Sequence, residues 1–124
     1  MIRIPLLFAM HLATPLLATP AFADEARVVG VEVERVGDGR YRFSVTLAHP
    51  DTGWDHYANA WHVESPNGER FGTRTLAHPH VDEQPFTRSA TIDVPAGTTH
   101  VTVRAEDSVH GLSTAVHKVE LPTQ

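Results

Sequence analysis

Residues 29–47 read VGVEVERVGDGRYRFSVTL and contain the clearest strand pattern of the chain. Apolar and polar side chains alternate on both sides of Gly37-Asp38-Gly39, and this period of two predicts strands with one buried face. The glycines predict a tight turn, so we expect an antiparallel hairpin. Its first strand buries Val29, Val31 and Val33. The inward residues of its second strand are Tyr41, Phe43, Val45 and Leu47.

The same alternation recurs along the rest of the chain, and no run with helical periodicity has a useful length. Trp61 and Val63 mark a third strand. Seven short strands in about 100 residues, with a buried Trp on the third, predict an all-β fold. We expect a seven-stranded immunoglobulin-like or fibronectin-III-like β-sandwich. Its remaining strands are predicted over residues 71–76, 86–94, 101–105 and 115–121.

Residues 1–23 are predicted to be a signal peptide rather than part of the fold. Arg3 supplies a short positive region, residues 4–17 form the apolar core, and Ala21-Phe22-Ala23 is an A-x-A cleavage motif. The apolar run is too short and too interrupted by proline to span a membrane. The chain also has no Cys that could carry a lipid. We therefore expect one β-sandwich domain at residues 24–124, in the periplasm or secreted, with no membrane insertion.

The composition of the expected mature chain narrows its partners and its metal chemistry. Nine Lys and Arg stand against fifteen Asp and Glu, a net charge of −6 that disfavours nucleic acid and anionic membranes. Eight of the nine histidines remain, whereas both methionines lie in the signal peptide and Cys is absent. Nitrogen and oxygen ligands without sulfur favour Cu(II), Zn(II) or Ni(II) over Cu(I) or a blue-copper site.

Strand connections alternate between the two ends of the predicted sandwich. Three short turns, rich in Gly, Pro or Asn, therefore fall at one end. Three long loops, residues 49–58, 77–85 and 107–112, fall at the other, where recognition loops gather on this scaffold. We expect five imidazoles to converge there. They belong to His49, His56, His78, His80 and His110.

The loop AHPHVDEQPFTR, residues 77–88, carries the densest set of candidate ligands. Its two prolines fix φ and donate no N–H, which predicts a stiff loop. His78 and His80 can turn both rings toward one ion, or they can lie on the surface bonded to loop carbonyls. Glu83 can complete a metal site, orient an imidazole, or only pair with Arg88.

The segment DSVHG, residues 107–111, offers His110 as a third ligand. Arg88 and Asp107 both have the parity of inward-facing strand residues, and a hairpin closed at 95–97 would make them diagonal neighbours. An inward Arg and an inward Asp must pair or suffer desolvation. We therefore predict an Arg88–Asp107 salt bridge beneath the loop end, which supports the site.

The loop segment GWDHY, residues 53–57, brings two aromatic side chains to the same end. Trp54 and Tyr57 form either a lid that contacts a ligand or partner, or a hydrophobic plug over the end of the sandwich. His56 in this segment and His49 just before it are further possible ligands.

The predicted layout resembles the small periplasmic copper-resistance (CopC-type) proteins, which are exported sandwiches with His and Asp at one end. In that family a histidine at the mature N-terminus ligates Cu(II), whereas this mature chain opens Asp24-Glu25. The resemblance thus implies copper binding only through the loops. A second resemblance, to small exported bacterial proteins of unassigned function, implies no activity. It is carried by residues 53–57, 78–80, 83–89 and 107–111.

Two functions follow from these patterns. The first is an exported protein that binds Cu(II) or Zn(II) for metal storage, delivery or tolerance. Its predicted ligands are His78, His80 and His110, with His49, His56 or Glu83 as additions. The second is a non-metal binding or assembly module that docks a periplasmic protein or small ligand through a loop end with Trp54, Tyr57 and Phe86. An enzyme is less favoured, because nucleophile-elbow, phosphate-loop and zinc-protease motifs are absent.

Overall fold

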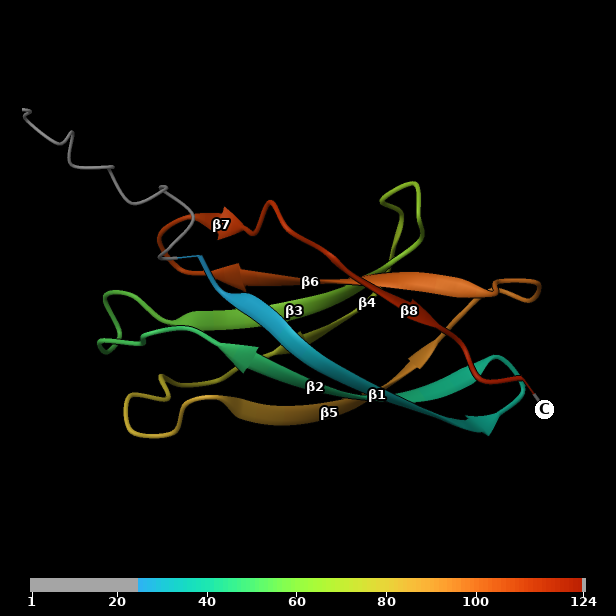
Figure 1. The fold of residues 1–124 in the computed structure, drawn as a ribbon, viewed down its shortest axis with the longest axis horizontal. Helices are drawn as coiled ribbons and strands as arrows, with labels where there is room; N and C mark the ends of the chain where they lie inside the picture. The colour runs from blue at the N-terminus through green and yellow to red at the C-terminus, as the bar shows by residue number, and fades with distance from the viewer. Residues whose placement is uncertain (1–24, 124) are drawn as a thin grey trace, which may run out of the picture.

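The computed structural model describes residues 25–123, which fold into β-strands joined by loops (Figure 1). The predicted signal peptide, residues 1–23, lies outside the described residues. Within them the chain forms eight strands. These are β1 (Arg27–Gly37), β2 (Arg40–Ala48), β3 (Ala58–Glu64), β4 (Arg70–Thr75), β5 (Phe86–Asp93), β6 (His100–Asp107), β7 (Gly111–Leu112) and β8 (His117–Glu120).

The strands form two antiparallel sheets that face each other. One sheet has the order β1-β2-β5, and the other has the order β4-β3-β6, with β7 and β8 both paired to β6. The predicted all-β sandwich is confirmed at this level. The described chain holds one strand more than the seven expected, because the two-residue β7 precedes the predicted last strand.

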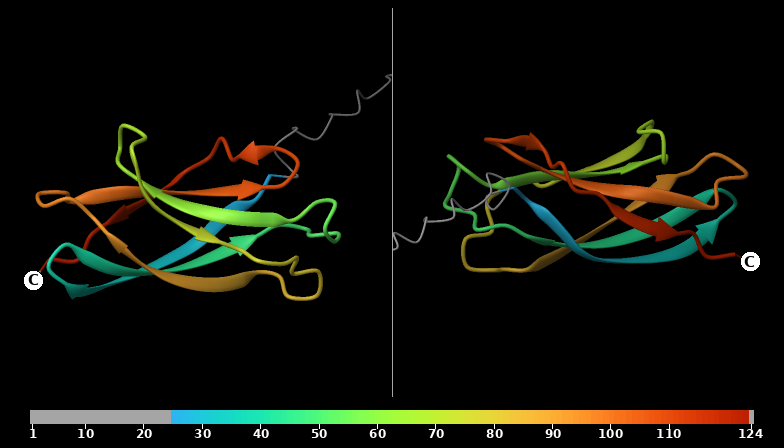
Figure 2. Two further views of the ribbon diagram at one scale, coloured as in Figure 1. Left: turned by 180° about the vertical axis from the view of Figure 1, so that it is seen from behind. Right: turned by 45° about the horizontal axis from the view of Figure 1, so that its top comes forward.

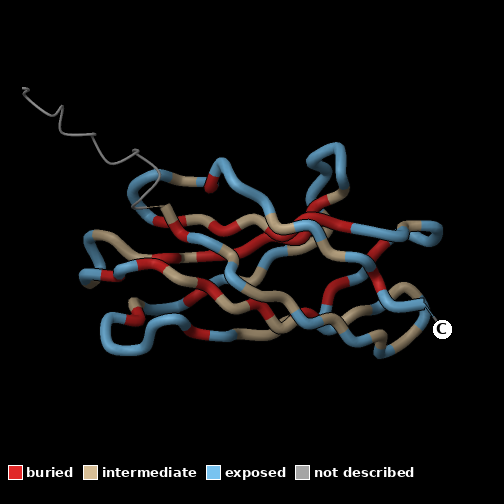
Figure 3. The backbone as a smooth tube through the Cα atoms, in the orientation of Figure 1, coloured by how far each residue is buried: buried red, intermediate tan, exposed pale blue. Residues whose placement is uncertain are grey.

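The core lies between the two sheets, and Figure 3 shows buried residues along the strands of both. Trp61 on β3 is fully buried, as the sequence predicts, and Phe43 and Phe86 are the next largest of the buried side chains. Burying each such side chain contributes about 2–3 kcal/mol. This packing takes the place of disulfides in a chain without Cys.

The start of β1 departs from the predicted alternation. Its register against β2 shifts between Val28 and Gly30, so Val28 packs against the core while Val29 is 48% exposed. One irregular residue in a strand reverses which face every later or earlier side chain meets. Val31 and Val33, beyond the shift, pack against the core as predicted.

The turn after β5 does not close a hairpin, contrary to the prediction. β5 pairs with β2, which sets Phe86 opposite Leu47, whereas β6 pairs with β3, which sets Asp107 opposite Ala58. The chain therefore crosses from one sheet to the other at residues 94–99. Alternation tells which side chains face inward, but it does not tell which sheet a strand joins.

The three predicted loops gather at one end, but the connections do not sort by length: residues 108–110 form a shorter connection than residues 65–69 or 94–99. The loops 49–57, 76–85 and 108–110 lie together at the left end in Figure 1, and both views of Figure 2 agree. A backbone hydrogen bond joins two of these loops, in which Ser108 N–H donates to the Tyr57 carbonyl at 2.9 Å. Among the described residues, no helix is long and apolar enough to cross a bilayer.

Candidate metal centre

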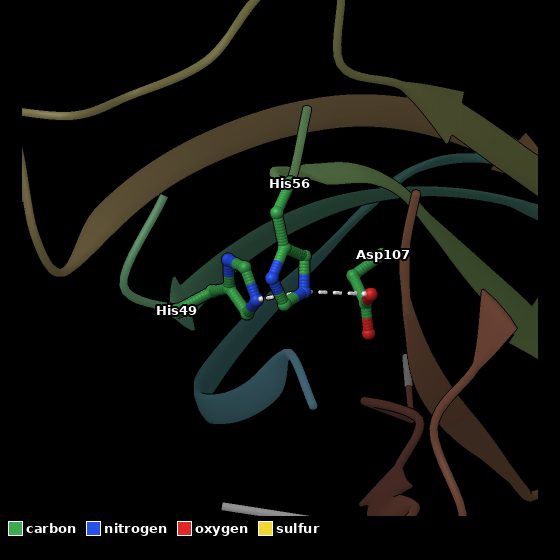
Figure 4. A group of neighbouring side chains, drawn as sticks. All are labelled: His49, His56 and Asp107. Atoms are coloured by element: carbon green, nitrogen blue, oxygen red, sulfur yellow. Dashed lines mark hydrogen bonds and ion pairs between the residues drawn. The ribbon is translucent and has the colours of Figure 1, made fainter. Parts of the chain in front are cut away.

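The loop 49–57 and the end of β6 bring three potential ligands together. His49, His56 and Asp107 each offer a ligand atom, and these atoms lie within 4.8 Å of one another. His56 Nε2 is central: it lies 3.1 Å from His49 Nε2 and 3.0 Å from Asp107 Oδ1 (Figure 4). Among the described residues, this is the group of three or more His, Cys, Asp or Glu whose spacing suits one ion.

A local turn brings His56 back over His49. Gly53 adopts a φ of 142°, which a side chain would disfavour, and forms an isolated bridge with His56. Thr52 N–H then donates to the His56 carbonyl at 3.0 Å. As a result, the ring centroids of His49 and His56 lie 4.6 Å apart, although the two residues are seven positions apart in the sequence.

The third member of the group, Asp107, is the last residue of β6. Its pairing with Ala58, two residues after His56, places its carboxylate beside the His56 ring. Asp107 is 1% exposed, and its Oδ1 also accepts hydrogen bonds from Val109 N–H at 3.0 Å and His110 N–H at 2.8 Å. Its Oδ2 is buried without a hydrogen-bond partner.

Asp107 is held in its charged form. Burial opposes ionisation, but hydrogen bonds from the backbone of His110 and Val109, and from the His110 ring, outweigh it and lower the pKa of the carboxyl below its usual value. His110 Nδ1 lies 3.0 Å from Asp107 Oδ1. A carboxylate that stays ionised near neutral pH is an effective ligand for a divalent cation.

His110 lies beside the group, as its prediction as a ligand requires. Its ring centroid is 5.0 Å from that of His56, and its side chain is partly exposed. It is thus the nearest further imidazole that the structure records next to His56 and Asp107. The sequence did not rank His49 and His56 above the other loop histidines, because the bridge between Gly53 and His56 has no local signature.

Asp51 lies behind His49 and is the functional candidate that sequence reasoning missed. Its side chain is fully buried, and its Oδ1 lies 2.5 Å from His49 Nδ1 and accepts the Ala58 N–H at 3.0 Å. Its Oδ2 accepts the His80 N–H at 2.8 Å. The spacing His-x-Asp in a loop was the signal available, and it is too common to be decisive alone.

His78 and His80 lie on the third loop, and among the described residues they form no common group of candidate metal ligands with His110. The two rings are 4.7 Å apart, but that of His80 stacks on Phe86 at 3.9 Å, and His78 is exposed with its Nδ1 bonded to the Pro79 carbonyl. His78 therefore matches the surface alternative. Both ring nitrogens of His80 are buried without a hydrogen-bond partner. Metal binding by this pair stays a prediction.

Burial shapes the protonation of His80. Loss of solvent, followed by the nearby charges of Arg88 and His78, lowers the pKa of this imidazole below its usual value of 6.5. The ring is therefore neutral at pH 7. A neutral ring against the face of Phe86 avoids burying a charge.

The predicted Arg88–Asp107 salt bridge is wrong. Arg88 pairs with Glu83, with Nη1 3.3 Å from Oε1 and Nη2 3.4 Å from Oε2, and it lies on β5 in the sheet that does not contain Asp107. Glu83 thus takes the role of a partner of Arg88, which was one of its three alternatives. The Arg88 guanidinium lowers the pKa of Glu83, mainly through its hydrogen bond.

Trp54 and Tyr57 form an edge-to-face pair with centroids 5.5 Å apart. Trp54 is 66% exposed, so it does not plug the core. Val81 and Val109 are also exposed on the neighbouring loops. Apolar side chains thus stand at the tips of all three loops around the candidate metal centre.

Comparisons with known proteins show few relatives. No model of a known protein family matches the chain. Over 87 residues, 70% of the chain, the sequence is 52% identical to a protein of Halomicrobium mukohataei named "Putative lipoprotein". These residues make up 43% of that relative, so the chain spans less than half of its length. The likeness to copper-resistance proteins has no family match behind it and stays a prediction.

Solved structures that align with this chain include superoxide reductases. The enzyme from Archaeoglobus fulgidus (neelaredoxin) aligns with a TM-score of 0.51 at 14% identity, over 87% of this chain and 98% of that one. The enzyme from Giardia intestinalis aligns with a TM-score of 0.43 at 17% identity, over 73% and 95%. At such identities the first alignment shows a shared β-fold alone. The described domain is therefore a β-sandwich with a His/Asp cluster at its loop end.

Proposed function

We propose that this chain is an exported metal-binding protein that holds one divalent ion, Cu(II) or Zn(II), at the loop end of an immunoglobulin-like or fibronectin-III-like sandwich. The proposed ligands are His49, His56 and Asp107. The observation that carries the proposal is the convergence of their ligand atoms within 4.8 Å from the loop 49–57 and the end of β6. The roles it fits are metal storage, delivery or tolerance.

The spacing of the ligand atoms supports this proposal. Atoms bound about 2 Å from one tetrahedral ion lie about 3.3 Å apart. The separations of 3.1 Å between His49 Nε2 and His56 Nε2, and of 3.0 Å between His56 Nε2 and Asp107 Oδ1, are close to that value. Small movements of the side chains would therefore admit an ion.

The chemistry of the donor set supports the same class of ion. Two imidazoles and one carboxylate are ligands that Zn(II) and Cu(II) accept readily, and the described chain offers no sulfur ligand. The buried Asp107 Oδ2 has no hydrogen-bond partner, and such an atom is satisfied when a cation binds nearby. His110 is proposed as an additional ligand, while His78, His80 and Glu83 stay candidate ligands from the sequence alone.

Export is part of the proposal. The N-terminal pattern of residues 1–23 predicts a signal peptide, and the relative from Halomicrobium carries a name that implies export. An oxidising, extracytoplasmic compartment suits a histidine and carboxylate site for Cu(II) or Zn(II), since these ligands resist oxidation whereas thiols do not.

Isothermal titration of the metal-free protein with Zn(II), and separately with Cu(II), tests the proposal. We expect one ion per chain in the natural protein and loss of that site in the double variant His49→Ala/His56→Ala. The control is His100→Ala, which removes an exposed imidazole at the other end of β6. Stoichiometric binding that survives in the double variant would exclude this ligand set.

A second variant distinguishes the two sets of candidate ligands. His78→Ala removes the exposed imidazole of the third loop without touching His49 or His56. We expect it to bind Zn(II) as the natural protein does. Loss of the site in this variant would instead favour the ligands predicted from residues 77–88.

The exposed aromatic pair favours a second candidate function, the docking of a periplasmic protein or small ligand. Trp54 is 66% exposed beside Tyr57, and aromatic side chains of this kind commonly anchor interfaces. A partner found in the same compartment would then bind equally well after chelation of metal and lose affinity in Trp54→Ala. Binding that requires metal and tolerates Trp54→Ala would rule this function out.

A further inference from the structure

The buried carboxylate of Asp51 contacts the His49 ring on the side away from the proposed ion. We propose that Asp51 is a positioning residue that fixes the tautomer and orientation of His49, so that His49 Nε2 faces the ion. This inference rests on the proposed function in its metal-binding part. Its structural part, the tautomer of His49, is open to a test without metal.

Asp51 receives hydrogen bonds on both of its oxygens. Oδ1 accepts the Ala58 N–H at 3.0 Å, and Oδ2 accepts the His80 N–H at 2.8 Å. A backbone N–H can only donate, so both oxygens must act as acceptors. The remaining contact, from Oδ1 to His49 Nδ1, is then satisfied when the imidazole nitrogen carries the proton.

A proton on His49 Nδ1 has a direct consequence for the opposite ring nitrogen. In a neutral imidazole one nitrogen donates and the other keeps its lone pair. With the proton at Nδ1, the lone pair lies on Nε2, the atom 3.1 Å from His56 Nε2. Carboxylates placed in this way behind a ligating imidazole orient the ring and raise its basicity.

Asp51 also connects the third loop to the centre. The His80 N–H that it accepts belongs to the loop 76–85, and Gln84 Nε2 donates to the His80 carbonyl at 3.0 Å. Gln84 Oε1 in turn accepts the His49 N–H at 3.0 Å. The third loop thus holds His49 in place through its backbone and Gln84, and the His80 ring also approaches Asp51, with Nδ1 4.0 Å from Oδ2.

The variant Asp51→Asn tests the inference. The amide keeps the size of the carboxylate but presents one oxygen and one NH₂ group to three donors. With its oxygen on the His80 N–H, its NH₂ group faces the Ala58 N–H and His49 Nδ1 and favours the His49 tautomer protonated at Nε2. With its oxygen in the place of Oδ1, the NH₂ group faces the His80 N–H and the His49 tautomer is retained. The control is Asp55→Asn, which removes the same charge from an exposed position in the same loop.

Two measurements read out the effect. Nitrogen-15 NMR of the histidine rings in the metal-free protein reports each tautomer, and we expect His49 to be protonated at Nδ1 in the natural protein and in Asp55→Asn. In Asp51→Asn we expect a larger share of His49 protonated at Nε2 than in Asp55→Asn. Titration with Zn(II) should show a dissociation constant raised about 10- to 100-fold in Asp51→Asn. In Asp55→Asn we expect a change of less than about threefold.

The outcomes separate this inference from the proposed function. Protonation of His49 at Nε2 in the natural protein would overturn the inference, and this measurement stands even where Asp51→Asn fails to fold. An unchanged Zn(II) affinity in a folded Asp51→Asn would overturn it while leaving the metal site intact. Absence of Zn(II) binding by the natural protein, with His49 protonated at Nδ1, would overturn the proposed function and leave Asp51 with a positioning role in the loop.

Discussion

Asp107 Oδ1 lies 3.0 Å from His56 Nε2, although 51 residues separate the two in sequence. The contact joins the end of β6 to the loop between β2 and β3, and it exists because Asp107 pairs with Ala58 at the start of β3. Position in the sheet, rather than the loop sequence, therefore sets the geometry of the candidate metal centre.

Replacing Asp107 by Asn tests how much this carboxylate contributes to the free energy of unfolding. Its Oδ1 receives donors from His56, Val109 and His110, and hydrogen bonds to a charged group contribute about 1.5–3 kcal/mol each. We expect Asp107→Asn to lower the free energy of unfolding by about 2–3 kcal/mol. Urea denaturation measures this loss. Asp93→Asn, at an exposed position paired with Arg40, should change it by less than about 0.5 kcal/mol.

Metal binding should stabilise the folded chain. An ion that binds only the native state adds about 2.7 kcal/mol when its free concentration is 100 times the dissociation constant. For a domain of this size, that corresponds to a rise in melting temperature of about 10 °C or more. Differential scanning calorimetry with Zn(II) should show the rise, and a chelator should reverse it. An equal rise in His49→Ala/His56→Ala would argue for binding elsewhere.

Acid should weaken the metal-free fold through two buried histidines. Burial, and then the charges of Arg88 and His78, lower the pKa of His80, while burial and the charge of Arg70 lower the pKa of His62. When the folded-state pKa lies below the unfolded value, the unfolded chain takes up protons first as the pH falls. The stability that this contributes is present above about pH 6.5 and decreases below it.

Denaturation of the metal-free protein at about pH 7.5 and about pH 5.5 checks this sign, with lower stability expected at the acid value. His80→Phe removes one titrating group and retains an aromatic ring against Phe86, so its stability should depend less on pH. His100→Ala, an exposed histidine, should keep the natural dependence. A stability that rises on acidification would contradict the assignment.

Gly72 on β4 is required by the packing between the sheets. A Cβ added there would lie 2.9 Å from Ile92 Cγ2 and 3.0 Å from Ile92 Cγ1, closer than side chains tolerate. We expect Gly72→Ala to destabilise the fold by about 1–3 kcal/mol. In an Ile92→Ala background the same substitution should cost less, because the clashing atoms are gone. Equal costs in both backgrounds, measured by urea denaturation, would show that the clash relaxes freely.

Alternation of apolar and polar residues does not predict the surroundings of Val29, Arg88 and His62, and the structure shows the reason for each. Val29 faces outward because the register shifts near Gly30, and a bulge leaves no reliable mark on the alternation. Arg88 has inward parity, as predicted, but the other sheet holds Asp107. His62 alternates with the inward Trp61 and Val63 on β3, yet it is buried beside Thr73 on β4, with Nδ1 2.7 Å from the Thr73 hydroxyl oxygen.

Alternation and turn residues act over a few neighbouring positions, so the sequence predicts the strand pattern, the buried Trp61 and the end of the sandwich at which the three loops gather. Which loop residues meet depends on the tertiary structure. Asp51 reaches both His49 and the backbone of His80, and Asp107 reaches His56, through strand pairings and a loop bridge. Such contacts depend on the packing of distant segments, and no local pattern of residues encodes them.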